Sequence, residues 1–166
     1  MESVETGLEA ALDFCAPDEH VPEAERNNRS IQDRVIAGFY RTPYKRIPKV
    51  MTRHLVMSAA RSLNWLPAKG GISQFYSPHM ILNHKNLDWN RDFKYEFGAY
   101  VHAQQVNSPS NNNKPRKVDC IYLSPDYRNP SGHILMDLNS GREIIRPNVT
   151  ECVITELVIK RVEQMA

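Results

Sequence analysis

Glu25 begins a run of polar side chains whose spacing would place them together on one face of a helix. Asn28, Arg29 and Gln32 follow it by three, four and seven residues, and these intervals bring side chains to one stripe of an α-helix. A carboxylate can ligate a metal ion, and guanidinium and amide groups donate hydrogen bonds to phosphate oxygens. The stripe therefore suits contact with a phosphodiester backbone. The alternative is a solvated, charged helix face that binds nothing.

Basic residues are concentrated around this stripe. Residues 26–61 contain nine Lys or Arg and the single acid Asp33, a net charge of +8, whereas residues 1–25 contain eight acids and no Lys or Arg. A basic patch of this kind usually binds a polyanion. The residues that we expect to contact nucleic acid are Arg26, Asn28, Arg29, Gln32, Arg34, Lys45, Arg46 and Lys49.

Two helices must position these side chains. Pro22 is favourable in the first turn of a helix, and apolar residues recur after it at helical spacing. A second helix is predicted from about Pro48 to Leu66, because the residue before a proline avoids helical geometry and Pro43 and Pro48 interrupt the chain. The apolar faces are Ala24, Ile31, Val35 and Phe39 in the first helix and Met51, Leu55, Ala59 and Leu63 in the second. A short strand is expected before them at residues 10–16.

A connector and a β-rich segment follow the helices. In residues 67–94, Ser77 and Pro78 predict a short helix to about Asn83, and Trp89 and Phe93 are expected to pin the connector to its surroundings.

From Tyr95 the apolar residues alternate, which predicts four strands near residues 97–103, 118–123, 134–138 and 142–146, with a hairpin loop at residues 139–141. Short strands joined by tight turns indicate a small β-barrel. Residues 107–117 are expected to form a disordered loop, and residues 154–165 a short amphipathic helix.

The motif from Ala24 to Ser30, A-E-R-x-N-R-S, resembles the glutamate-bearing helix of integrases from copia-type LTR retrotransposons. The resemblance continues in P-Y-K-R-I-P at residues 43–48, S-P-x-x-I-L at residues 77–82 and G-x-x-x-x-D-L-x-S-G-R-x-I at residues 132–144. It implies an α+β fold with three parts. Residues 1–66 would be the end of an RNase H-like catalytic core, with a short strand and two long helices. Residues 67–94 would be a connector, and residues 95–166 a Src-homology-3-like β-barrel with a C-terminal helix.

The resemblance also implies a catalytic role for Glu25. In that family an Asp-Asp-Glu triad holds divalent metal, Mg²⁺, for DNA strand transfer, and Glu25 matches the glutamate. The two aspartates of the family lie further upstream, and neither Asp13 nor Asp18 lies in the family's aspartate motif. We therefore expect that this chain alone neither holds Mg²⁺ stably nor catalyses strand transfer. His79 and His84 are five residues apart, a poor spacing for a shared metal.

The sequence thus indicates a nucleic-acid-binding fragment of a retrotransposon polyprotein, truncated at its N-terminus. DNA is the expected partner and RNA the alternative, and oligomerisation with other integrase-type chains is a further expectation. Two other functions stay open: a protein-interaction module built on the barrel, and a translated transposon relic without function.

The remaining composition bears on location. No apolar run approaches the roughly 20 residues of a membrane span, and the N-terminus lacks a signal-peptide pattern. Cys15, Cys120 and Cys152 are too widely spaced to suggest a disulfide framework or a zinc site. We expect an intracellular protein that is not secreted, and a nuclear location is compatible with binding DNA.

Overall fold

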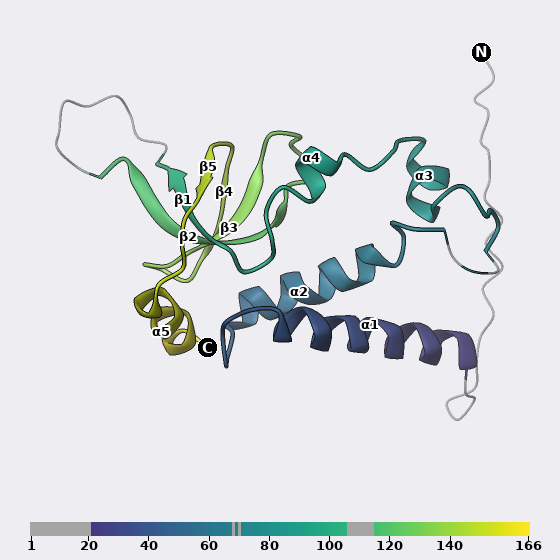
Figure 1. Ribbon diagram of the computed structural model, residues 1–166, viewed down its shortest axis with the longest axis horizontal. Coiled ribbons are helices and arrows are strands. Elements are labelled where there is room, and N and C mark those ends of the chain that lie inside the picture. Colours follow the sequence, from purple (N-terminus) through teal and green to yellow (C-terminus); the bar gives the residue numbers. More distant parts are fainter. Residues whose placement is uncertain (1–20, 68, 70, 106–114) are drawn as a thin grey trace, which may run out of the picture.

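The computed structural model describes residues 21–67, 69, 71–105 and 115–166. It has the predicted α+β class: a pair of long helices lies beside an antiparallel sheet (Figure 1). The strand predicted at residues 10–16 and most of the loop predicted at residues 107–117 lie outside the described residues.

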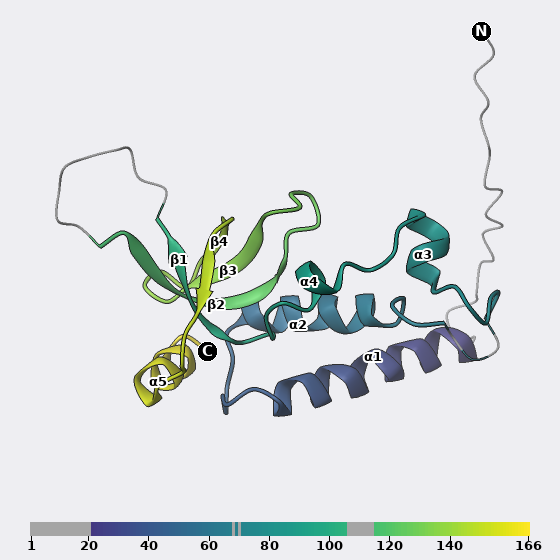
Figure 2. The same cartoon turned by 45° about the horizontal axis from the view of Figure 1, so that its top comes forward.

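The two long helices run side by side in opposite directions (Figures 1 and 2). α1 spans Pro22–Tyr40 and α2 spans Lys49–Ser62, so both helices were predicted and α2 ends four residues earlier than expected. They approach each other closely at Gly38, where an added Cβ atom would lie 2.9 Å from the Cδ1 atom of Leu55. A larger residue at this position would require the Leu55 side chain to shift.

The connector contains two short helices. α3 spans Pro78–Asn83, and the Ser77 hydroxyl accepts a hydrogen bond from the Met80 backbone N–H at 3.2 Å, as expected of an N-cap. α4 spans Trp89–Asp92 and was not predicted. The Phe93 ring lies 4.9 Å from the Trp65 ring and 4.6 Å from the Trp89 ring, between centroids. These aromatic contacts hold the connector against the end of the helical pair, as predicted.

The sheet has five strands, one more than predicted. Its strands are β1 (Tyr100–Gln104), β2 (Lys117–Pro125), β3 (His133–Asp137), β4 (Glu143–Arg146) and β5 (Val149–Glu151), and α5 (Glu156–Gln164) follows them. Every pairing is antiparallel, in the order β4-β3-β2-β1-β5, so that β4 and β5 are the edges. Gly141 has a φ of +69° in the predicted β3–β4 hairpin loop. The sequence did not reveal β5, because three residues are too few to show an alternating pattern.

The two faces of the sheet belong to separate apolar cores. In the first core, Met51 of α2 and Val162 of α5 pack with Ile121, Leu123 and Met136 of the sheet. The second core consists of Val101, Ala103, Cys120, Tyr122 and Leu135, which all come from β1, β2 and β3. Because the first core joins α2 to the sheet, residues on both sides of the connector stabilise each other.

Candidate nucleic-acid interface

The predicted stripe of polar side chains lies on the exposed surface of α1. Glu25, Asn28, Arg29 and Gln32 are all exposed, and their spacing puts them on one flank of the helix. Pro22 occupies the first turn, and the preceding Val21 is extended, so the helix begins where the sequence indicated. The side of α1 that faces α2 carries the half-buried Ile31, Val35 and Phe39, whereas Ala24, which was predicted with them, is exposed.

Arg34 does not lie on this stripe. It follows Gln32 by two residues, and at about 100° per residue its side chain emerges on the opposite flank of α1. There the Arg34 guanidinium donates a hydrogen bond to the Ser62 hydroxyl of α2 at 2.6 Å. Arg34 therefore bridges the two helices, while Arg26, which is also exposed, points outward near the start of α1.

Lys45, Arg46 and Lys49 form a second basic group at the other end of α1. All three are exposed, in the turn between the helices and at the start of α2. α1 has 19 residues and is about 28 Å long at 1.5 Å per residue. The predicted contact residues are thus divided into a stripe near the start of α1 and a turn group beyond its end. A ligand that contacts both must be extended.

Few of the cations in this region are neutralised by a neighbouring carboxylate. Arg41 pairs with Glu96 at 2.8 Å, and Arg53 pairs with Glu143. The other seven basic side chains of residues 26–61 make no ion pair with any described residue. Repulsion between unpaired cations is relieved when an anion binds, so this surface is suited to phosphate.

The described residues do not form a metal centre around Glu25. Among them, no group of three His, Cys, Asp or Glu side chains could hold a metal ion. His79 and His84 have separate contacts. The His79 Nδ1 atom lies 3.2 Å from the Asn83 amide nitrogen, and His84 caps the end of α3 with a φ of +52°. A two-metal site needs several convergent carboxylates, and the donor set that the structure describes does not fit that requirement.

A cavity of about 520 Å³ lies where the helical pair faces α4, the segment after it and the end of β2. Arg34 lines it from α1, Arg61 from α2 and Ser124 from β2. The Arg61 guanidinium carbon stands 4.4 Å from the centre of the Tyr127 ring, which also lines the cavity. Except for Arg34, none of these residues was predicted from the sequence. Their positions follow no spacing rule, because the wall is assembled from segments far apart in the chain.

The chain matches no protein-family model, and comparison with curated proteins and with solved structures likewise gives no match. Within the described residues, no helix combines the length and apolar character that crossing a membrane requires.

Proposed function

We propose that this chain is a DNA-binding segment of a copia-type LTR retrotransposon integrase, and that it binds without cutting or joining DNA on its own. In this proposal α1 and α2 are the end of an RNase H-like core, and β1 to β5 are a Src-homology-3-like barrel. Glu25 is the glutamate of the family's triad. The Mg²⁺ of the parent family would need carboxylates beyond those that the described residues bring together.

The exposed stripe of α1 is the observation that carries the proposal. Asn28, Arg29 and Gln32 present amide and guanidinium donors to solvent next to the Glu25 carboxylate. Neither Arg26 nor Arg29 forms an ion pair with a described residue. Guanidinium groups without carboxylate partners can donate paired hydrogen bonds to phosphate oxygens.

The arrangement of the sheet supports the barrel assignment. β1 to β4 are joined to their neighbours in sequence order, and β5 returns to pair with the outer side of β1. Val101, Cys120 and Leu135 are fully buried on a face whose contacts come from the strands and from residues that flank them, such as Tyr95. A strongly twisted sheet can cover one of its own faces, as a small barrel does, although β4 and β5 are edges here and do not pair with each other.

Binding of duplex DNA at increasing salt tests the proposal. For a protein that neutralises several phosphates, log K falls linearly with log salt, with a slope of roughly −0.9 per phosphate contact. We expect a slope of about −4 or steeper, since several unpaired cations lie along α1 and its following turn. Single-stranded RNA in the same titration would measure the preference between DNA and RNA. Affinity that does not change with salt would contradict the proposal.

A protein-interaction module is the second candidate function. Val153 and Leu157, beside the sheet, are 87% and 79% exposed, and a contiguous patch of exposed apolar side chains is typical of protein contact sites. Binding through such residues depends little on salt, so the same titration separates the two functions. For a DNA-binding integrase segment we further expect a nuclear location and association with other integrase-type chains.

A further inference from the structure

The cavity between the helical pair and the sheet has the size and lining of a small-ligand site. Its volume of about 520 Å³ is within the range of roughly 300–1,000 Å³ that such sites occupy. Six of the residues that line it are aromatic, and they come from three separate segments. They are Trp65, Phe93, Tyr95, Phe97, Tyr122 and Tyr127.

Tyr122 and Ser124 line the cavity, and their buried hydroxyl groups have no hydrogen-bond partner among the described residues. Tyr122 is 2% exposed and Ser124 is 5% exposed. A buried polar group without a partner is costly, so such groups usually serve a ligand or a bound water. Burial raises the pKa of the Tyr122 phenol, which therefore stays protonated and can both donate and accept. Two such hydroxyls can bind a ring that presents donors and acceptors along one edge.

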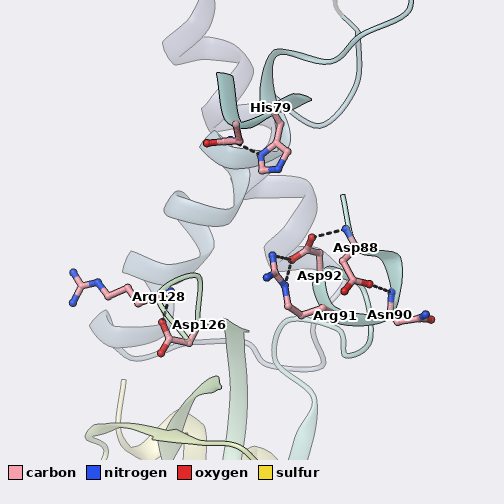
Figure 3. A network of polar contacts seen from close by, with 8 residues as sticks. His79, Asp88, Asn90, Arg91, Asp92, Asp126 and Arg128 are labelled. Atoms are coloured by element: carbon pink, nitrogen blue, oxygen red, sulfur yellow. Dashed lines mark hydrogen bonds and ion pairs between the residues drawn. The ribbon is translucent and has the colours of Figure 1, made fainter. Parts of the chain in front are cut away.

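The unpaired charge around the cavity is positive, because the acidic side chains that line the cavity are already bound to basic groups or to backbone N–H groups. The Asp92 carboxylate, which lines the cavity, accepts hydrogen bonds from the Arg91 side chain and from the Asp88 backbone N–H (Figure 3). Glu96 is paired with Arg41. Arg34 and Arg61 form no ion pair with any described residue. Two guanidinium groups thus remain available to an anion held beside the aromatic wall.

We infer that this cavity binds one unpaired nucleotide, with the base stacked among the aromatic rings and the phosphate held by Arg34 and Arg61. The inference rests on the proposed function, because it gives the DNA-binding surface a site for a base that has left the duplex. The Tyr122 and Ser124 hydroxyls bind polar atoms of the base. Arg61, which is held over the Tyr127 ring, presents its guanidinium edge to the phosphate. An aliphatic ligand would leave both hydroxyls and both guanidinium groups without partners.

Titration of the full chain with dAMP, followed by calorimetry and by Trp fluorescence, tests the inference. Deoxyribose 5-phosphate is the matched probe that lacks the base. Stacking and edge contacts should make dAMP bind roughly tenfold more tightly than the abasic probe. Equal affinity for the two probes, or no saturable binding of dAMP, would overturn the inference.

The double variant Tyr122→Phe/Ser124→Ala removes only the two unpartnered oxygen atoms. Removing buried groups that have no partner in the free protein should leave the thermal midpoint equal or higher. Binding of dAMP should nevertheless weaken roughly tenfold, since two hydrogen bonds are lost. Tyr76→Phe, at an exposed tyrosine that does not line the cavity, should bind dAMP as the unchanged chain does. Unchanged dAMP affinity in the double variant would refute the site.

Arg29→Glu separates this inference from the proposed function. Arg29 lies on the α1 stripe and does not line the cavity. The variant should lose duplex affinity and bind dAMP normally. A chain that binds duplex DNA but not dAMP would refute the cavity site alone. A chain that binds dAMP through Tyr122 and Ser124 but no duplex would refute the proposed function alone.

Discussion

The Tyr44 hydroxyl donates a hydrogen bond to the backbone carbonyl oxygen of Gly98 at 2.8 Å, across 54 residues of sequence. Tyr44 is 3% exposed, in the turn between α1 and α2. Gly98 has a φ of +84°, and an added Cβ atom there would lie 3.2 Å from the Thr42 methyl group. One buried contact therefore fixes the helical pair against the beginning of the sheet, and it needs a glycine at that position.

Tyr44→Phe should lower the free energy of unfolding by about 1–2 kcal/mol, because the buried Gly98 carbonyl oxygen loses its donor while the ring stays packed. Urea denaturation measures the change. Tyr76→Phe provides the control, since Tyr76 is 54% exposed and its substitution should change stability by less than about 0.5 kcal/mol. Equal stability of both variants would show that the Tyr44 hydrogen bond contributes nothing net.

Met51→Ala should destabilise the sheet as well as α2. Met51 is fully buried in the core that it shares with Ile121 and Leu123, and deletion of such a side chain costs about 2–5 kcal/mol. Hydrogen exchange should show amides of β2 and of α2 losing protection together. Met57→Ala, at a residue of α2 that is 39% exposed, should cost less than about 1 kcal/mol. Loss of protection confined to the helices would contradict a shared core.

The periodicity of the sequence was enough to predict most of the elements. Helical spacing gave α1 and α2, and the Ser77-Pro78 pair marked the start of α3. Periodicity shows which face of a helix or strand is apolar, but it does not show which other element packs against that face. The packing of Met51 with Ile121 is therefore not visible in the sequence, although it joins the helical pair to the sheet across the connector.

The candidate site was predictable only where its residues share one helix. Glu25, Asn28, Arg29 and Gln32 share one stripe, because helix geometry alone places them there. The same geometry turned Arg34 to the other flank of α1, toward Ser62. The cavity depends on packing between distant segments, so composition could not indicate that Arg61, Ser124 and Tyr127 line one space.

Stability should depend on the ionised state of Glu143. A hydrogen bond from the His54 Nε2 atom, at 3.0 Å, holds the pKa of this carboxyl below its usual 4.5, aided by the charge of Arg53 and opposed by partial burial. Because the folded-state pKa is the lower one, the ionised carboxylate stabilises the fold above pH 4.5. That contribution is lost as the pH falls through the lowered pKa.

Glu143→Gln should therefore lower the thermal midpoint at pH 7, and the gap to the unchanged chain should close as the pH falls through the lowered pKa of Glu143. Thermal unfolding followed by circular dichroism at several pH values measures this gap. The control is Glu151→Gln, at an exposed residue that makes no ion pair with a described side chain. If the gap for Glu143→Gln stays constant with pH, the His54–Glu143 contact contributes no pH-dependent stability.

Arg29→Glu should weaken binding to duplex DNA by about 1 kcal/mol or more and reduce the magnitude of the salt slope by about one unit. We expect this because Arg29 lies on the exposed α1 stripe and has no ion-pair partner among the described residues, so its charge is available to a phosphate. Arg142→Glu is the matched control, because it changes the net charge equally at an exposed residue beside the β3–β4 hairpin. A similar loss in both variants would mean that net charge, and not the α1 stripe, determines the affinity.

This chain alone should neither cut nor join DNA in the presence of Mg²⁺ or Mn²⁺. Glu25 offers one carboxylate, and among the described residues no group of three His, Cys, Asp or Glu could hold a metal ion. Two-metal catalysis clamps both the attacking and the leaving oxygen between ions roughly 4 Å apart, and a single exposed carboxylate holds Mg²⁺ too weakly to order such a pair.

A missing activity is informative only for a folded chain that binds its substrate. The comparison is therefore between the unchanged chain and Glu25→Gln, both tested for thermal unfolding and duplex binding before incubation with labelled duplex. Equal, background levels of cleavage in the two are the expected result. Cleavage by the unchanged chain that disappears in Glu25→Gln would mean that further carboxylates complete a metal site with Glu25. Asp13, Asp18 and Glu23 are near it in sequence, and substituting each by its amide would then show which of them binds the metal.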